Sequence, residues 1–292
     1  RKLAECIKSI VKLDDKSLVI DIGSNDGSLL ICFKNLGARV LGIDPAKNLV
    51  KIAVLNGIET VEGYFDSKLA LRAAKKYGKA RAILSTNTIA HIPNLNEVLK
   101  GASILMEKEG IFVMQFPYVM DLLDKNLFDT IYHEHLSYFS LKSLLKLSEK
   151  SDLGIFDIQR NDLDGGAIRV FWKKREGTRN KINKKNINKI LGEEKRYGLY
   201  EKETYSKFAD RIKALKIDFL QKINYLKKKK KRIVGYGAAA KANVLLNYFG
   251  LDTKTIDYIV DSTPYKQGLF TPGTHIPIYS EEEMRKAKPD YL

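Results

Sequence analysis

The densest group of reactive side chains in this 292-residue sequence is Tyr132-His133-Glu134-His135, at the start of the polar cluster YHEHLSYFS within an apolar stretch. On a strand, His133 and His135 would share one face, and Tyr132 and Glu134 the other. Histidine ionises near neutral pH, so it can take up and release a proton there. We interpret the group as a general base beside a tuning carboxylate. The alternatives are a structural polar network and a metal held by the two histidines, for which no further ligands are evident.

A second candidate, His91, lies in NTIAHIPN, which follows an expected strand at residues 81–86. Ligands of parallel α/β sheets bind beyond the carboxyl ends of the strands. His91 and Asn87 are therefore candidate site residues, and a histidine that caps or packs against a helix is the alternative.

Another motif, DIGSNDG, follows the first expected strand and opens a helix, whose free N–H groups suit an anionic or polar ligand. Its spacing is GxxxG with an acidic residue ahead, the pattern of class I S-adenosylmethionine methyltransferases, and not the GxGxxG of dinucleotide folds. A carboxylate at the end of the second strand, in GIDP, can accept both ribose hydroxyls. The alternative is a generic turn with a helix-capping carboxylate. The predicted cofactor residues are Asp21, Gly23, Ser24, Asn25, Gly27, Asp44, Pro45 and Asn87.

Two further glycine motifs suit an anionic substrate. Gly165 and Gly166 precede Arg169 on an expected strand, and a guanidinium pairs well with anions. Tyr236 and Gly237 open a second glycine loop with Lys241 in the following helix and Asp261 at the end of the next strand, an arrangement that suits a pyrophosphate. The alternatives are a tight turn with a surface arginine, and a vestigial nucleotide fold kept as a scaffold.

The elements that position these motifs follow from periodicity. Strands are expected at 17–23, 38–44, 57–63, 81–86 and 110–116, with helices at 27–36, 45–56, 66–78 and 94–107 between them. Such alternation predicts βαβ units and a parallel sheet. Within 131–173, three strand-like runs and a helix at 141–151 are expected to extend the sheet with antiparallel strands. A second strand, glycine loop and helix begin at 232, and a last helix is expected at 280–287.

The net charge of +16 is concentrated in one segment, because residues 173–232 hold 22 Lys and Arg against 7 Asp and Glu, which leaves +1 for the rest. That segment includes one long amphipathic helix between residues 205 and 223 and reads as a solvated linker, with a polyanion-binding surface as the alternative. The sequence shows no membrane-spanning run. Its two cysteines form no CxxC pair, so they indicate no disulfide framework or zinc site and fit a cytoplasmic setting.

Together, the motifs DIGSNDGSLL, NTIAHIPN, YHEHLSYFS, DGGAIRVF and GYGAAAKANVLLNYFG resemble the sugar C-methyltransferase family along essentially the whole chain. The resemblance implies an α/β protein: a class I methyltransferase Rossmann-like domain at 1–175, a basic helical linker at 176–231 and a smaller Rossmann-like domain at 232–292. Family members carry an N-terminal zinc module that this sequence lacks. We therefore read the chain as part of a longer polypeptide, with its C-terminal domain cut short, and expect zinc only in that module.

The resemblance further implies the activity: S-adenosylmethionine-dependent methylation at C-3 of a nucleotide-linked 4-keto-deoxysugar, through an enolate. His135 matches the family's proposed base, and Tyr132, Glu134 and His91 match its supporting residues. A monomer without a nucleic-acid or membrane partner is expected. The alternatives are an O- or N-methyltransferase for another small molecule, a nucleic-acid-binding protein that uses the basic segment, and a binding protein without catalysis.

Overall fold

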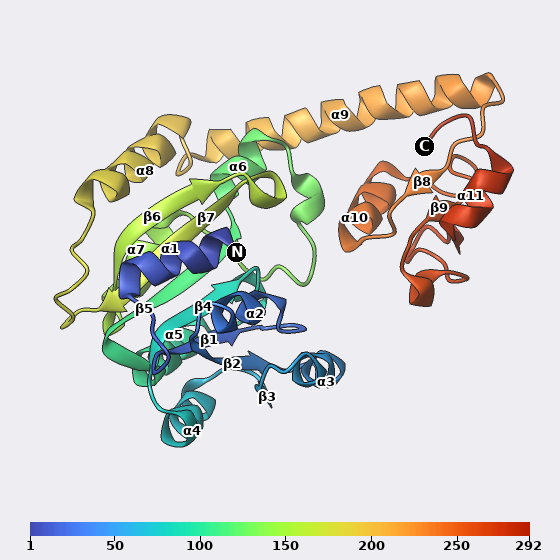
Figure 1. Ribbon diagram of the computed structural model, residues 1–292. Coiled ribbons are helices and arrows are strands. Elements are labelled where there is room, and N and C mark those ends of the chain that lie inside the picture. Colours follow the sequence, from blue (N-terminus) through green and yellow to red (C-terminus); the bar gives the residue numbers. More distant parts are fainter. The chain divides into compact units, whose positions relative to one another are not determined.

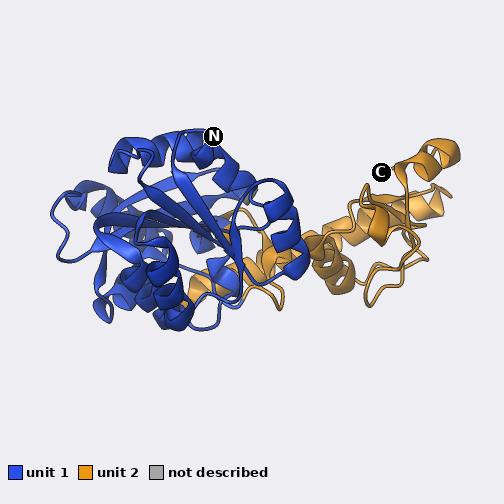
Figure 2. Ribbon diagram, turned by 60° about the horizontal axis from the view of Figure 1, so that its bottom comes forward, with its two compact units in different colours: residues 1–121, 136–200 blue, residues 122–135, 201–292 orange. Residues whose placement is uncertain are grey.

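A computed structural model of the protein describes residues 1–292, apart from the side chain of Asp164. Its internal contacts divide the chain into two compact units. Unit 1 comprises residues 1–121 and 136–200, and unit 2 comprises residues 122–135 and 201–292 (Figure 2). These boundaries differ from those of the three predicted segments. Residues 122–135 group with the C-terminal part of the chain, and residues 176–200 group with the N-terminal part. The three-segment division itself stays a prediction.

Unit 1 is built on a seven-stranded sheet of order β3-β2-β1-β4-β5-β7-β6. The first five strands are parallel, and β7 runs antiparallel to both β5 and β6. The sheet therefore has a switch point between β1 and β4, where the chain changes direction of travel across the sheet. The strands are β1 (Leu18–Ile22), β2 (Arg39–Asp44), β3 (Thr60–Glu62), β4 (Ala80–Thr86), β5 (Met106–Pro117), β6 (Leu153–Asn161) and β7 (Ala167–Lys174).

The five predicted parallel strands and the antiparallel extension are confirmed, with one exception. The run at 131–140 is not a strand but a loop that follows the short 3-10 helix η2 (Phe128–Thr130). Its aromatic and β-branched residues have the composition of a strand, but its pairing is limited to an isolated bridge between Phe139 and Tyr118.

Helices cover the sheet of unit 1, and α1 lies across one of its faces (Figure 1). One core cluster joins α1, α2 and α3 to alternate residues of the strands, among them Ala82 and Leu84 of β4 and Ile111 and Val113 of β5. This alternation is what a pleated strand requires, because every second side chain faces the same side. The helices are α1 (Lys2–Val11), α2 (Ser28–Lys34), α3 (Lys47–Leu55), α4 (Ser67–Tyr77), α5 (Leu95–Leu105), α6 (Val119–Asp124), α7 (Leu141–Glu149) and α8 (Lys184–Tyr197), with the 3-10 helices η1 (Ile89–His91) and η3 (Leu163–Gly165). The boundary between the units falls within α6, whose residues 122–124 belong to unit 2.

Unit 2 contains a smaller sheet of three parallel strands, β8 (Gly235–Tyr236), β9 (Ile259–Val260) and β10 (Ile278–Tyr279), in the order β10-β9-β8. The C-terminal part of the basic segment forms α9 (Lys202–Lys228), which confirms the predicted long helix. Its apolar residues Phe219 and Leu220 pack on the core that α10 (Ala240–Phe249) shares with β9 and β10. The 3-10 helix η4 (Pro264–Lys266) and α11 (Glu281–Ala287) complete the unit. Within the described residues, no helix is both long and apolar enough to cross a membrane.

Candidate active site

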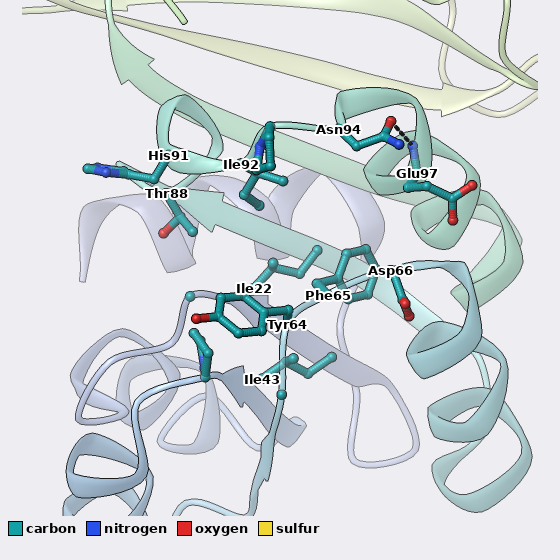
Figure 3. A pocket seen from close by; sticks show the side chains of 14 residues that line it. Ile22, Ile43, Tyr64, Phe65, Asp66, Thr88, His91, Ile92, Asn94 and Glu97 are labelled. Carbon is teal, nitrogen blue, oxygen red and sulfur yellow. Dashed lines mark hydrogen bonds between the residues drawn. The ribbon is translucent and has the colours of Figure 1, made fainter. Parts of the chain in front are cut away.

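Unit 1 contains a cavity of about 500 Å³ at the carboxyl ends of β1 to β4, next to the switch point of the sheet. Figure 3 shows Tyr64 and Phe65 on one side of it and His91 and Ile92 on the other. The lining is mostly apolar, which suits an aromatic ring system with a few polar anchors. It consists of Ile22, Gly23, Ile43, Pro45, Gly63, Tyr64, Phe65, Asp66, Thr88, His91, Ile92, Pro93, Asn94 and Glu97.

The glycine loop after β1 approaches the neighbouring β4 loop closely. Gly23 has φ 76°, and a Cβ at this position would lie 2.2 Å from Oγ1 of Thr88. Its N–H donates to the carbonyl oxygen of Ile43 at 2.8 Å. Gly27, with φ 83°, begins α2 and faces Ile58. Both positions therefore need glycine for backbone conformation and for space.

Asp44, at the end of β2, joins two loops. Its Oδ2 accepts the N–H of Asn25 at 2.9 Å, and its Oδ1 accepts the N–H of Ala46 at 2.9 Å. A carboxylate oxygen has two lone pairs, so each oxygen retains one for a ligand hydroxyl. The carboxylate thus fixes the glycine loop and keeps the capacity to accept a pair of ribose hydroxyls.

Asp21 and Ser24 are buried polar residues of the same loop region. The Oδ1 of Asp21 and the Oγ of Ser24 have no hydrogen-bond partner among the described residues. Burial, together with the charge of Asp44, raises the pKa of Asp21 well above its usual range. A buried polar atom without a partner is costly, so a cationic ligand group at Asp21 would offset this cost.

Asn87 and His91 follow β4, as predicted. Asn87 has φ 55°, and its N–H donates to the carbonyl oxygen of Gln115 at 2.8 Å. His91 ends η1 and lines the cavity. The neighbouring residue Ala90 accepts the N–H of Leu136 at 2.8 Å, which ties η1 to the point where the chain re-enters unit 1.

Several lining residues were not predicted: Tyr64, Phe65, Asp66, Thr88, Ile92, Asn94 and Glu97. The position of the first three carried a signal, because they directly follow the expected third strand. Asp66 accepts the N–H of Leu69 at 2.7 Å and Asn94 accepts the N–H of Glu97 at 3.2 Å, so both begin helices. Tyr64 is 84% exposed, which leaves its ring accessible at the edge of the cavity.

Tyr132 and His135 belong to unit 2 and contact one another. The Oη of Tyr132 lies 3.3 Å from Nε2 of His135, and the ring centroids lie 4.4 Å apart. The expected strand faces, with Tyr132 and His135 on opposite sides, are therefore wrong. The N–H of His135 bonds to the carbonyl oxygen of Tyr132 at 3.0 Å, and this turn places the two side chains together.

The tautomer of His135 follows from its other ring nitrogen. Nδ1 lies 2.7 Å from the carbonyl oxygen of Thr130. A carbonyl oxygen only accepts hydrogen bonds, so Nδ1 carries a proton, and in the neutral ring Nε2 holds a lone pair. Burial and then the charge of Glu134 raise the pKa of Tyr132, so its hydroxyl stays protonated and donates to Nε2. Glu134 and His133 are exposed.

Arg169 occupies the centre of a polar network on β7. Its Nε and Nη2 donate to Oε1 of Gln115 at 3.0 and 2.7 Å, and its Nη1 donates to Oε1 of Gln159 at 3.1 Å. Gly166, with φ 139°, packs on the side chain of Asp121. Gly165 lies in η3. Three donors of the guanidinium are thus already engaged, and a substrate role for Gly165, Gly166 and Arg169 stays a prediction.

The second glycine loop repeats the geometry of the first. The N–H of Gly237 donates to the carbonyl oxygen of Val260 at 2.7 Å, and Oδ2 of Asp261 accepts the N–H of Ala238 at 2.8 Å. Unlike Asp44, Asp261 also pairs with a cation, because Nζ of Lys266 lies 3.2 Å from Oδ2. Against the effect of burial, hydrogen bonds from Thr263, Lys266 and Ala238 lower the pKa of Asp261 far below its usual range.

Two predicted residues lie beside this loop. The Oη of Tyr236 donates to the carboxylate of Glu281, and Lys241 lies in the first turn of α10. Among the described side chains, no cluster of three or more His, Cys, Asp or Glu has a geometry that could hold a metal ion.

Comparison with known proteins identifies the family. Residues 1–156 match the profile of a methyltransferase domain, and residues 162–292 match the profile of a C-methyltransferase C-terminal domain. The chain is 38% identical over 291 residues to C-methyltransferase NovU of Streptomyces niveus. The aligned residues cover 100% of this chain and 69% of that protein. This chain belongs to the C-methyltransferase family.

Other relatives share less with this C-methyltransferase. A ubiquinone biosynthesis O-methyltransferase of Xanthomonas oryzae pv. oryzae is 30% identical over 94 residues, 32% of this chain and 39% of that protein. A solved S-adenosylmethionine-dependent methyltransferase of Anabaena variabilis covers 60% of this chain and 84% of its own, at 15% identity and a TM-score of 0.48. The assignment rests on the family profiles and on the relative that matches along the whole of this chain. The predicted class I fold and S-adenosylmethionine dependence are confirmed.

The cavity of the C-methyltransferase fits S-adenosylmethionine. Asp21 and Ser24 offer buried, unpartnered oxygens to the charged amino-acid end, and Asp44 offers acceptors to the ribose. Gly23 has no side chain, so the loop lies close to Thr88 and its backbone is open to a cofactor that passes there. Tyr64 and Phe65 provide apolar surface for the adenine ring. Each role of a single residue remains a prediction.

Proposed function

We propose that this C-methyltransferase transfers a methyl group to C-3 of a nucleotide-linked 4-keto-deoxysugar through an enolate. The observation that carries the proposal is the tautomer of His135. Its Nδ1–H is held by Thr130, so Nε2 keeps a lone pair with which to remove a proton. Methylation at carbon needs a carbon nucleophile, and a C–H beside a ketone becomes one by losing that proton. A base fixed in this tautomer is what such a step requires.

The proposed step balances as follows. Nε2 of His135 takes the C-3 proton, and the electrons of that C–H bond form the C-3 to C-4 double bond while O-4 becomes an oxyanion. Bound S-adenosylmethionine supplies an electrophilic methyl group. The bond from C-3 to this carbon would form as the sulfur–methyl bond breaks, which would restore the carbonyl at C-4 and release S-adenosylhomocysteine. The proton on His135 then passes to solvent.

Tyr132 supports this step from the same turn. In the resting structure its hydroxyl faces Nε2 of His135, 3.3 Å away. A substrate C–H that approaches Nε2 displaces this contact, and the hydroxyl can then donate to O-4. The raised pKa of Tyr132 keeps it a donor at neutral pH. His91 is the second candidate for this donor, and Glu134 tunes the pair through its charge.

The remaining predicted residues are assigned to binding. We assign the substrate's phosphates to the second glycine loop, with Tyr236, Gly237 and Lys241, and an anionic substrate group to Gly165, Gly166 and Arg169. The enzyme would act as a monomer in the cytoplasm, without nucleic acid as partner. The high positive charge of α9 supports the attraction of an anionic nucleotide sugar.

The decisive experiment is mass spectrometry of reactions with S-adenosylmethionine and a panel of thymidine-, guanosine- and cytidine-linked 4-keto-deoxysugars. Wild type, His135→Ala and the matched control His133→Ala are compared, since His133 is exposed and lies two residues away. We expect one sugar to gain a methyl mass with wild type and His133→Ala only. If His135→Ala methylated the sugar at the wild-type rate, His135 would not be the base.

The oxyanion donor is tested by exchange of the C-3 proton in deuterated water. Slow exchange in His91→Asn with normal exchange in Tyr132→Phe would assign the role to His91. The reverse pattern would assign it to Tyr132.

A further inference from the structure

The loop that carries Tyr132 and His135 lies between two segments of unit 1 in sequence, yet it packs within unit 2. Phe128 of η2 stacks on Phe249 of α10, with ring centroids 5.5 Å apart and ring planes 16° apart. Tyr248 of α10 contacts the same ring at 5.6 Å. The position of the loop is therefore set by helices that lie about a hundred residues further along the chain.

One side chain of α9 binds the beginning of this loop at two points. The Nε of Arg211 donates to Oδ1 of Asn126 at 2.9 Å, and its Nη2 donates to the carbonyl oxygen of Leu123 at 2.6 Å. Asn126 has φ 56°, a left-handed conformation that reverses the chain direction there. A guanidinium offers two donors in fixed geometry, so the contact restrains orientation as well as distance.

Hydrogen bonds continue from this anchor to the imidazole. The N–H of Leu127 donates to the carbonyl oxygen of Leu122 at 2.9 Å, and the carbonyl oxygen of Leu127 accepts Oγ1 of Thr130 at 2.7 Å. Thr130 is 3% exposed, and its carbonyl oxygen accepts Nδ1–H of His135 at 2.7 Å. The group that fixes the tautomer of His135 is thus held within the turn that Arg211 anchors.

We propose that Arg211 is a positioning residue for His135. It touches no reacting atom. It fixes the turn at 123–130, and through Thr130 it sets where Nε2 of His135 points. The inference rests on the proposed function, because it concerns the placement of the proposed base.

The test compares Arg211→Lys, Arg211→Ala and the control Lys222→Gln. Lys222 is an exposed cation of α9 whose partner is Asp218, so its loss changes the charge of the helix but not the loop. The assays are proton exchange at C-3 of the sugar identified by the panel, kcat and KM for methyl transfer, and S-adenosylhomocysteine binding by calorimetry. Misplacement of a catalytic group by about 1 Å can cost about 100-fold in rate.

We expect Arg211→Ala to lower exchange and kcat by about 100-fold, and Arg211→Lys by about 10-fold, with KM and S-adenosylhomocysteine binding close to wild type. Added guanidinium should restore part of the exchange in Arg211→Ala, whereas sodium chloride at equal ionic strength should not. Such rescue would not follow from general destabilisation of the fold.

Two results would overturn this proposal alone, and a third would overturn it together with the proposed function. If Arg211→Ala exchanged the C-3 proton at the wild-type rate while His135→Ala did not exchange it, Arg211 would have no positioning role, and His135 would still be the base. A loss that guanidinium does not restore would show that Arg211 acts only on stability. If His135→Ala itself exchanged normally, the proposed function would fail, and the role of Arg211 with it.

Discussion

Asp21→Asn should stabilise the ligand-free enzyme while weakening its binding of S-adenosylmethionine. Asp21 is 2% exposed, its Oδ1 has no partner among the described residues, and burial and the charge of Asp44 raise its pKa. An aspartate with a raised pKa in the folded state is fully stabilising only below its unfolded pKa of about 4. As the pH rises above that value, ionisation favours the unfolded chain until the folded pKa is passed.

The size of both effects can be set from general values. Removal of a buried ionisable group without a partner should return about 1 kcal/mol or more at neutral pH, which raises the melting temperature of a unit of this size by about 2–4 °C. Loss of a charge-assisted hydrogen bond to the ammonium group costs about 1.5–3 kcal/mol, or roughly 10- to 100-fold in affinity.

The assay is thermal melting of the ligand-free protein between about pH 4 and pH 8, with calorimetric titration of S-adenosylmethionine at the upper pH. The difference between variant and wild type should be smallest at the acidic end and grow as the pH rises. Asp26→Asn is the matched control, because Asp26 is only partly buried in the same loop and hydrogen bonds from Ser28 lower its pKa. A less stable Asp21→Asn with unchanged affinity would refute the reasoning.

Three further predictions concern other parts of the molecule. Gly23→Ala should destabilise the protein more than Gly237→Ala. Both glycines have a left-handed backbone, which costs an alanine about 1–2 kcal/mol at either position, but only a Cβ at position 23 meets a neighbour, Oγ1 of Thr88 at 2.2 Å. Equal unfolding midpoints of the two variants in urea would contradict this prediction. Glu194 accepts four hydrogen bonds, and two of the donors, Tyr118 Oη and the Leu141 N–H, belong to buried residues. Glu194→Ala should therefore cost about 2–6 kcal/mol, at about 1–3 for each of these two buried donors. Glu193→Ala, which breaks a partly exposed pair with Arg160, should cost less than about 1 kcal/mol in the same urea titration. Tyr132→Phe should lower methyl transfer by about 100-fold. That loss should be constant between roughly pH 6 and pH 9, since burial raises the pKa of Tyr132. If the ratio of the wild-type rate to the Tyr132→Phe rate changed across this range, the hydroxyl would not act as a neutral donor.

Much of the fold could be predicted from local patterns, because the strands of a parallel sheet read as short apolar runs and its helices as amphipathic ones. The place of the glycine loop after β1 was predictable for the same reason: strands β1 and β2 place Asp21, Gly23 and Asp44, because the end of a strand fixes where the next residues lie.

The segment at 131–140 shows where local patterns fail. Its aromatic residues have strand composition, but the ring that anchors it, Phe128, stacks on Phe249, far away in sequence. No periodicity within the segment reports that contact. The engagement of Arg169 with Gln115 and Gln159 escaped prediction for a related reason, since it depends on the register of β5, β6 and β7.

The inserted position of residues 122–135 also bears on how such enzymes can be recombined. The chain passes between the two units after residues 121, 135 and 200. A chimera that exchanges only the region after residue 200 would combine an imported Arg211 and α10 with a resident loop shaped for other helices. A chimera that also exchanges residues 122–135 would keep Asn126, Phe128 and their partners matched. A correctly placed loop should therefore depend on two separate stretches of the gene, and crossovers that separate them should be selected against.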